Sequence, residues 1–252
     1  MIHVLIPNWN NEEWIARCLW SVKGQTGDCK VLVIDDASDD DSWPIIAPMV
    51  EAFDNFSAHR NEKQQFCPRN LWEGIQRMNP EPEDVIYLLD GDDFLPHDKV
   101  LERVERIFEN PYTWLTYGNY GVHPENTGQV PATNFPQEII AARYYRPWGR
   151  QLFNHPLIFR AHLWNALEES DMKKPDGQWY DIGYDKIIML PMLEMCTPFD
   201  PGQKPHWRFI DEDLYTYNSV NPRSDVFKPN AHDACAEIWK RPIKPPHEWP
   251  QQ

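Results

Sequence analysis

Residues 85–96 read V-I-Y-L-L-D-G-D-D-F-L-P, and this stretch decides which fold class the chain can adopt. The run Val85–Leu89 is short, continuous and apolar or aromatic, as in a strand that is buried on both faces. Three carboxylates follow it directly, those of Asp90, Asp92 and Asp93. In open α/β sheets, ligands bind beyond the carboxyl ends of the strands. The stretch therefore predicts a buried strand that carries a binding site at its end.

The same arrangement occurs twice earlier in the chain. Residues 2–6 predict a first strand, which ends in P-N-W-N, and residues 31–34 predict a second, which ends in D-D-A-S. A short third strand is predicted at residues 56–59, and helical spacing of apolar residues predicts helices between and after the strands, around 14–22, 45–53, 69–78 and 100–108. Asn10 or Asn11 is expected to cap the first of these helices. This alternation predicts an α/β fold with a mostly parallel central sheet flanked by helices.

The second half of the chain has a different composition. From about residue 118 it is rich in Trp, Tyr, Pro and polar residues, and only 159–167 and 187–193 are predicted as ordered elements. We expect an elaborated region there rather than more of the regular sheet. We therefore divide the chain into residues 1–117, residues 118–220 and a Pro-rich tail, 221–252, which we expect to wrap the surface or fray.

Charge and composition exclude several classes of protein. The 252 residues include 24 Lys and Arg against 39 Asp and Glu, with a formal net charge of -15 and no basic run, so extended nucleic acid is not an expected partner. Five cysteines without a C-x-x-C pair suggest neither a disulfide framework nor a zinc site. No window approaches a membrane span, and we expect a soluble cytoplasmic protein with reduced thiols.

The three carboxylates after residue 89 predict a metal site. Like charges at this spacing repel each other unless a cation joins them, and oxygen ligands of this kind suit Mg2+ or Mn2+. The alternative is a solvated acidic turn that caps the next helix. An EF-hand is excluded, because it would need Asp or Asn at Phe94, Gly at Leu95 and Glu at Leu101, and the chain has no phosphate-binding G-x-x-x-x-G-K-[ST] or G-x-G-x-x-G.

Four segments, in order, resemble the GT-A-fold nucleotide-sugar glycosyltransferases of the large family 2 type. I-H-V-L-I-P-N-W-N-N-E-E-W-I-A-R-C-L-W-S-V resembles the first strand and helix of that family, and V-L-V-I-D-D-A-S-D-D-D-S resembles its second strand. R-N-L-W-E-G-I resembles the helix after its third strand, and D-G-D-D resembles its D-x-D metal motif. The resemblance covers roughly residues 2–220 and implies a nucleotide-sugar half, 1–117, and an acceptor and catalytic-base half, 118–220.

The resemblance also implies roles for single residues on the donor side. Pro7, Asn8 and Trp9 would line the nucleobase and ribose pocket, Asp36 would hold the base or ribose, and Arg69 would lie near the nucleotide. Asp92 and Asp93, with Asp90 behind or beside them, would meet the ribose and the metal, so Asp90 and Asp92 count as donor-binding residues and Asp92 and Asp93 as metal ligands. Each residue also has a plain structural interpretation: a strand break at Pro7 and Asn8, a turn at Asp36 and a surface helix position for Arg69.

The catalytic base is implied by W-Y-D-I-G-Y-D-K-I-I-M-L-P-M-L. Asp185 precedes an apolar helical run and matches the family position better than Asp181, which stays the alternative. The usual Glu-Asp pair of the family is Tyr184-Asp185 here. The plain interpretation is that Asp185 caps the following helix.

Further candidates lie on the acceptor side and near the end of the family region. His155 matches a position near the acceptor site in some relatives, and a core histidine is the competing interpretation. Trp148, among other tryptophans, is available for stacking on a sugar. I-D-E-D-L-Y-T-Y-N-S-V-N-P-R-S resembles the closing element of the family, from which Arg223 and Ser224 would reach the donor diphosphate; an ordinary mobile loop is the other interpretation.

Together these features predict a metal-dependent glycosyltransferase. It would move a sugar from a nucleotide diphosphate donor, a UDP-sugar by our expectation, to a hydroxyl of a glycan or other acceptor, with inversion and with Mn2+ or Mg2+ as cofactor. A nucleotidyltransferase of the same fold and a noncatalytic nucleotide-sugar- or carbohydrate-binding domain are the alternatives. The first of these usually has a Gly-rich basic loop after strand one, which P-N-W-N-N-E-E does not provide.

Overall fold

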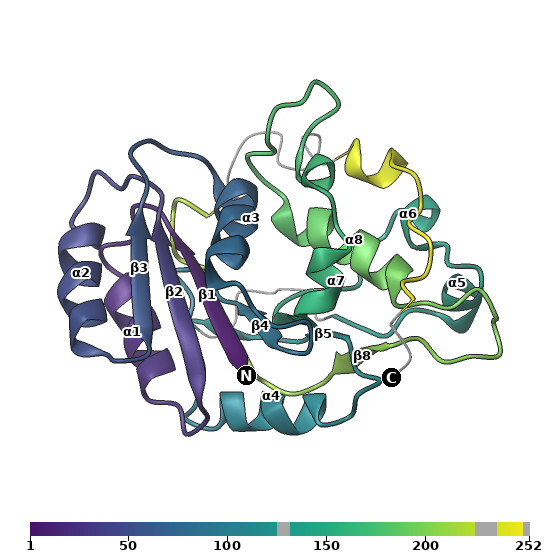
Figure 1. The fold of residues 1–252 in the computed structure, drawn as a ribbon, viewed down its shortest axis with the longest axis horizontal. Helices are drawn as coiled ribbons and strands as arrows, with labels where there is room; N and C mark the ends of the chain where they lie inside the picture. Colours follow the sequence, from purple (N-terminus) through teal and green to yellow (C-terminus); the bar gives the residue numbers. More distant parts are fainter. Residues whose placement is uncertain (125–131, 225–235, 249–252) are drawn as a thin grey trace.

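A seven-stranded mixed sheet forms the centre of the molecule in the computed structural model, which describes residues 1–124, 132–224 and 236–248 (Figure 1). The strand order is β3-β2-β1-β4-β7-β5-β8. The first four neighbours are parallel, whereas β7 runs antiparallel to both β4 and β5, and β8 is parallel to β5. The strands are β1 Ile2–Asn8, β2 Cys29–Asp35, β3 Phe56–Arg60, β4 Val85–Leu88, β5 Leu115–Gly118, β7 Leu157–Arg160 and β8 Trp207–Ile210.

Helices cover both faces of this sheet (Figure 1). The α-helices are α1 Ile15–Lys23, α2 Ser42–Ala52, α3 Cys67–Met78, α4 Val100–Phe108, α5 Gln137–Ala141, α6 Tyr145–Trp148, α7 Ala161–Asn165 and α8 Tyr184–Met195. Side chains alternate along each strand and therefore supply two cores. Leu5 of β1 joins the core with α3, α7 and α8, whereas Val4 and Ile6 join the core with α1, α2 and α4.

The predicted mostly parallel α/β sheet is confirmed, and the strands and helices expected before residue 110 are all present. One local expectation is wrong. Asn10 and Asn11 do not cap the first helix, which begins at Ile15 after Trp14 and has no side-chain cap. The side chain of Asn10 instead binds Asp39, and that of Asn11 binds Asn8 and Asn221.

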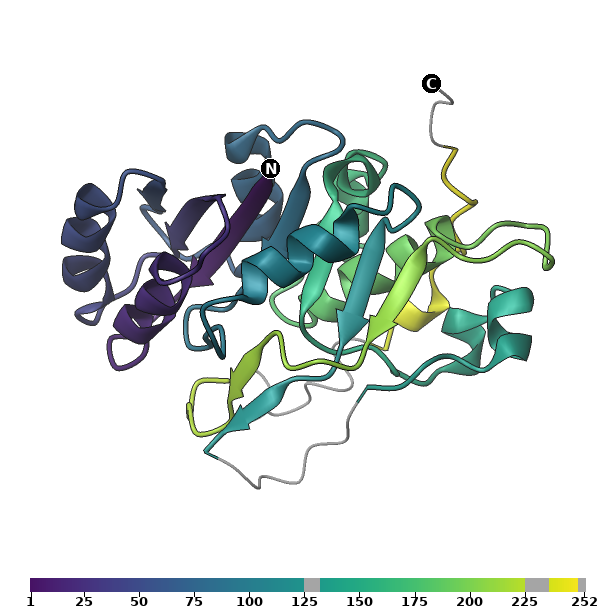
Figure 2. The same ribbon diagram turned by 90° about the horizontal axis from the view of Figure 1, so that it is seen from below.

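The second half also contributes strands to the sheet, contrary to the expectation of a region without more regular sheet. β7 and β8 both come from beyond residue 118, and β5 ends at Gly118. These strands are four residues long, too short to show a periodic pattern in the sequence. A separate two-stranded parallel sheet, β6 Gly121–His123 with β9 Thr216–Asn218, lies beside the main sheet (Figure 2).

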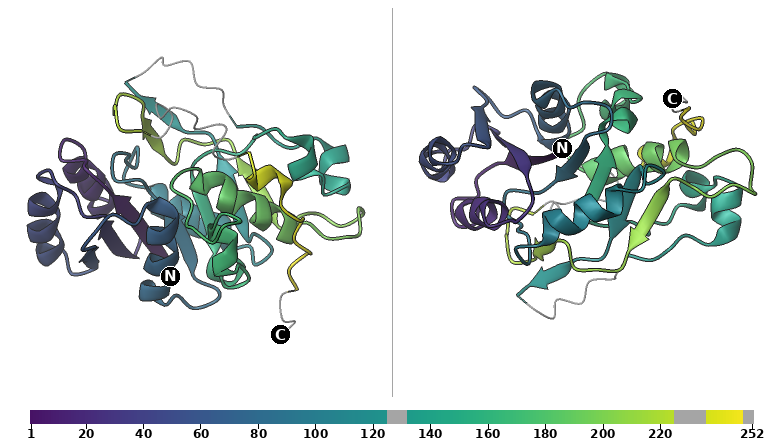
Figure 3. Two further views of the ribbon diagram at one scale, coloured as in Figure 1. Left: turned by 90° about the horizontal axis from the view of Figure 1, so that it is seen from above. Right: turned by 60° about the horizontal axis from the view of Figure 1, so that its bottom comes forward.

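Two parts of the Pro-rich tail are described, residues 221–224 and 236–248, and the second of them packs beside α8 (Figure 3). The backbone N–H of Lys244 donates to Glu194 Oε2 at 2.9 Å, and that of His247 donates to Met195 O at 2.8 Å. Glu194 is buried and paired with Arg146, whose Nε lies 2.6 Å from Glu194 Oε1. The tail is thus attached to α8 by backbone hydrogen bonds, one of them to a glutamate that also forms a buried ion pair with α6. No helix among the described residues is long and apolar enough to cross a membrane.

Four buried or half-buried histidines have lowered pKa values. Burial lowers the pKa of His162 to about 3 and that of His155 to about 4, and it also lowers the pKa of His206 and His247. His162 stacks on His247 with ring centroids 5.3 Å apart. These imidazoles are therefore neutral at pH 7.

We expect acid to destabilise the protein through these histidines. A histidine whose folded pKa is depressed stabilises the fold above its unfolded pKa of about 6.5, and that contribution is lost as the pH falls towards the folded value. In the wild type, His162 should make the unfolding free energy fall by up to about 1.4 kcal/mol for each pH unit between pH 6.5 and 4. His162→Phe should remove this contribution, and urea denaturation at several pH values would measure the difference. His97→Phe, at an exposed position, is the control, and equal pH slopes in wild type and His162→Phe would contradict the prediction.

Candidate active site

The carboxyl ends of β1, β2 and β4 meet at one edge of the sheet, because β1 pairs in parallel with both other strands. The N–H of Gly91 donates to Pro7 O at 3.1 Å, and that of Asp36 donates to Asn8 O at 2.8 Å. A Cβ on Gly91 would lie only 2.6 Å from Asn8 Oδ1, so the loop needs glycine for this approach. The structure therefore brings P-N-W-N, D-D-A-S and D-G-D-D together.

The three carboxylates of D-G-D-D have different partners. Asp90 Oδ2 accepts a hydrogen bond from the Tyr184 hydroxyl at 2.7 Å. Asp93 is 1% exposed, and its two oxygens accept from the Tyr215 hydroxyl at 2.5 Å and the Asn218 N–H at 2.7 Å. Asp92 is half-buried. The alternative of a solvated turn that caps the next helix is wrong, because Asp93 is buried and α4 has no side-chain cap.

Negative charge accumulates at this loop. Burial, reinforced by the charge of Asp90, raises the pKa of Asp92 to about 6. Burial and the charges of Asp92 and Asp90 raise the pKa of Asp93 well above its usual range. A divalent cation would offset the repulsion between these carboxylates, and carboxylate oxygens are suitable ligands for Mg2+ or Mn2+. Among the described residues, no three His, Cys, Asp or Glu side chains are grouped to hold a metal by themselves. Water and substrate oxygens would complete the coordination of such a cation.

The two carboxylates after β2 are buried in hydrogen bonds. Asp36, the predicted base or ribose ligand, accepts from the N–H groups of Gln65 at 2.7 Å and Phe66 at 2.8 Å, and from Asn61 Nδ2 at 2.7 Å. Asp35 accepts from Asn8 Nδ2 at 3.0 Å. Both side chains hold the loops around the site in place. The contact of Asp36 with a nucleotide stays a prediction.

The other predicted donor residues differ in exposure. Pro7 and Asn8 end β1 and are buried, whereas Trp9 is 36% exposed at the edge of the sheet. Arg69, in the first turn of α3, donates from Nε to Glu73 Oε1 at 2.7 Å, and its guanidinium carbon lies 5.7 Å from the centre of the Trp179 ring. In this structure Arg69 is thus held by its own helix and by an aromatic ring.

Asp185 lies near D-G-D-D, at the second position of α8. Its Oδ2 accepts from Gln151 Nε2 at 2.7 Å and lies 3.6 Å from Lys186 Nζ. The interpretation of Asp185 as a helix cap is wrong, because the N-cap of α8 is Gly183 and no side chain caps it. Asp181 is 45% exposed and pairs with Lys174 Nζ at 2.9 Å. Asp185 is thus the less exposed of the two candidate bases.

His155 packs against Tyr184 of α8 and against Tyr215. Its ring stacks on Tyr215, with centroids 4.6 Å apart and planes 13° apart. Burial lowers its pKa to about 4, against the opposing effect of the nearby Asp185 and Asp92 carboxylates. A neutral imidazole therefore has both of these carboxylates close to it. Trp148 packs elsewhere, against Phe135 and beneath the guanidinium of Arg150.

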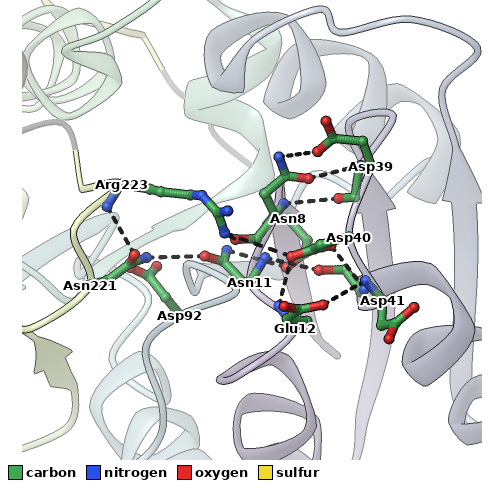
Figure 4. A network of polar contacts seen from close by, with 12 residues as sticks. Asn8, Asn11, Glu12, Asp39, Asp40, Asp41, Asp92, Asn221 and Arg223 are labelled. Carbon is green, nitrogen blue, oxygen red and sulfur yellow. Dashed lines mark hydrogen bonds and ion pairs between the residues drawn. The ribbon is translucent and has the colours of Figure 1, made fainter.

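Residues 215–224, which we call the closing segment, complete the site from far along the chain. Phe94 and Thr216 exchange backbone hydrogen bonds of 3.2 and 2.9 Å, which attach the segment to the D-G-D-D loop. Asn221 Nδ2 donates to Asp92 Oδ2 at 2.7 Å (Figure 4). Arg223 binds Asn10 O at 2.5 Å and lies 3.8 Å from Asp40, and Ser224 bonds the hydroxyl of Tyr217 at 2.8 Å. Tyr215, Asn218 and Asn221 belong to no motif that would predict them as site residues from the sequence.

Comparison with known proteins identifies the family. The model for "Glycosyl transferase family 2" matches residues 3–169, about two thirds of the chain. The chain belongs to glycosyl transferase family 2. It is therefore a glycosyltransferase, and the predicted family is confirmed.

Two curated proteins resemble this glycosyltransferase in sequence. An uncharacterized protein of Mycobacterium tuberculosis is 33% identical over 266 residues, which cover 95% of this chain and 81% of that protein. Glycosyltransferase AglE of Haloferax volcanii is 34% identical over 107 residues, which cover 40% of this chain and 33% of AglE. The match thus spans only a third of the length of AglE.

Two solved structures share the GT-A fold of this glycosyltransferase. Residues 1–349 of Staphylococcus aureus TarS, in complex with UDP-GlcNAc, superpose with a TM-score of 0.65 at 14% identity, over 94% of this chain and 65% of that one. The mannosyltransferase PcManGT of Pyrobaculum calidifontis, in complex with GDP-Man and Mn2+, has a TM-score of 0.63 at 12% identity, over 97% and 65%. These likenesses confirm the predicted fold.

Proposed function

We propose that this glycosyltransferase is metal-dependent and inverting, and that it transfers a sugar from a nucleotide diphosphate donor, a UDP-sugar, to an acceptor hydroxyl. The observation that carries the proposal is the 2.7 Å hydrogen bond from the Tyr184 hydroxyl to Asp90 Oδ2, because it joins the start of α8, where Asp185 follows Tyr184, to the loop that contains Asp92. One carboxylate belongs to the accumulated charge at the sheet edge, and the other lies on a separate helix. Such a pair suits binding of a cation by one group and proton transfer by the other.

The donor would lie over the carboxyl ends of β1, β2 and β4. Pro7, Asn8, Trp9 and Asp36 would surround the nucleoside, with Arg69 nearby and Asp90 at the ribose. Asp92 would hold the cation, and Asp93 would add its charge from the buried side of the loop. Bound there, Mn2+ or Mg2+ would supply positive charge for the departing diphosphate. The choice of a UDP-sugar and a divalent metal is supported by the TarS complex with UDP-GlcNAc and the PcManGT complex with Mn2+.

The protein groups would carry out the transfer as follows. Asp185, held by Gln151 Nε2, would accept the proton of the acceptor hydroxyl as its oxygen forms the bond to the anomeric carbon. The bond from that carbon to the diphosphate oxygen would break on the opposite face, which inverts the configuration. His155, and Trp148 if the acceptor is long, would contact the acceptor, a glycan or another hydroxyl-bearing molecule.

A screen of nucleotide sugars tests this function. Because a ligand that binds only the folded state stabilises it, the donor should raise the melting temperature, and a UDP-sugar should do so more strongly with Mn2+ than with EDTA. At 100 times its Kd, a ligand adds about 2.7 kcal/mol to the unfolding free energy. Stabilisation that is the same in Mn2+ and EDTA would contradict metal dependence. Donor binding without hydrolysis or transfer to any acceptor would favour a noncatalytic binding domain.

A further inference from the structure

We propose that Asn221 is a positioning residue for the Asp92 carboxylate and sets its orientation for a divalent cation. The inference rests on the proposed metal dependence. It assigns this role to the closing segment, about 130 positions along the chain from the carboxylate that it orients.

The contacts of Asn221 engage its whole amide group. Nδ2 donates to Asp92 Oδ2 at 2.7 Å and to Asn11 Oδ1 at 3.0 Å, while Oδ1 accepts from the Arg223 N–H at 3.0 Å (Figure 4). The residue is only 4% exposed. A buried amide with partners on both of its ends has one preferred orientation, because a flip would set like atoms against each other.

Asn221 also ends a chain of asparagines that connects the strand ends. Asn11 Nδ2 donates to Asn8 Oδ1 at 3.3 Å, and Asn8 Nδ2 donates to Asp35 Oδ1 at 3.0 Å. Each amide thus donates to the next side chain in the series, from Asn221 through Asn11 and Asn8 to the Asp35 carboxylate at the end of β2. Buried hydrogen bonds in such a series support one another. This series of hydrogen bonds fixes the position of Asp92 relative to the ends of β1 and β2, where the nucleotide-sugar donor would bind.

The neighbouring carboxylate, Asp93, separates two possible roles of Asn221, orienting Asp92 and attaching the closing segment to the loop. Asp93 already attaches the closing segment to the loop, since its two oxygens bind the Tyr215 hydroxyl and the Asn218 N–H. The segment would therefore stay docked without the contact between Asn221 and Asp92. A hydrogen bond to one carboxylate oxygen leaves the other available to a cation, and such outer contacts fix the geometry of metal ligands.

The experiment measures binding of Mn2+ alone, followed by electron paramagnetic resonance of the free ion, and again with UDP present. Asn221→Leu keeps roughly the volume of the side chain but removes its hydrogen-bonding amide, and Asn221→Ala also removes most of the side-chain volume. Both should weaken Mn2+ binding by about 10- to 100-fold, the usual cost of losing an outer-shell partner. Val220→Ala, at the exposed neighbouring position, should bind as wild type does. Melting temperatures in EDTA should stay within a few degrees for all three variants.

Two results would overturn the inference while leaving the proposed function intact. One is wild-type Mn2+ affinity in both Asn221 variants. The other is a loss of Mn2+ affinity that is proportional to the loss of melting temperature in Asn221→Leu and Asn221→Ala. That result would assign Asn221 a role in stability alone. If the wild type binds no Mn2+, with or without UDP, the proposed cation site fails, and the role of Asn221 fails with it.

Discussion

Asp185→Asn should lower turnover by about 10²- to 10⁴-fold, the usual contribution of a general base, while the donor still binds. The amide keeps the size of the carboxylate and can still accept from Gln151 Nε2, so the start of α8 should not move. It cannot take a proton from the acceptor hydroxyl. Steady-state transfer rates and the Kd of the donor, measured on the same variant, should therefore separate: kcat falls and the Kd changes less than about threefold.

Asp181→Asn is the matched control, since the same change falls four positions earlier, on a side chain that is 45% exposed and paired with Lys174. It should leave turnover within about threefold of wild type. Full transfer by Asp185→Asn would remove Asp185 as the base. Full transfer by Asp185→Asn together with an inactive Asp181→Asn would move the role to Asp181.

Asp92→Asn should abolish the dependence of donor binding on Mn2+ and lower kcat/KM on the order of 10³-fold. A bound cation stabilises transition-state charge by several kcal/mol, and the variant would lose most of that. Mn2+ titration and donor hydrolysis would measure the two effects. Asp98→Asn, an exposed carboxylate beyond the same loop, is the control and should behave as wild type does.

The metal-free stability of Asp92→Asn should change in the opposite direction. Because the pKa of Asp92 is raised to about 6 in the folded protein, its ionised form costs stability once the pH rises through that value. At pH 7.5 with EDTA, removing the charge should stabilise the protein by up to about 2 to 3 kcal/mol. A less stable, metal-free Asp92→Asn at that pH would show that the carboxylate contributes to the fold and not only to a cation site.

The donor side could be predicted further than the acceptor side for a physical reason. Parallel strands align their carboxyl ends, so any motif that directly follows a strand must lie at the same edge, and the structure places Asn8 and Gly91 in contact there. The prediction that Asp185 lies near this edge came from the family resemblance. The start of α8 does contact the loop, through Tyr184 and Asp90, while the role of Asp185 as the base stays a prediction. Arg69 shows the limit, because a sequence cannot tell whether a helical arginine turns to a ligand or to Glu73.

The sequence by itself determined the α/β class, the positions of the first four strands along the chain and the cluster of carboxylates after β4, because apolar runs, helical spacing and strand-end motifs are local patterns. Only the tertiary structure decided that β7 and β8 extend the same sheet, and that Asp90, Asp92 and Asp93 have separate partners in Tyr184, Asn221 and Tyr215. Those partners lie 94 to 129 positions away. No local pattern records such a pairing, since it depends on how the closing segment and α8 pack against the sheet edge.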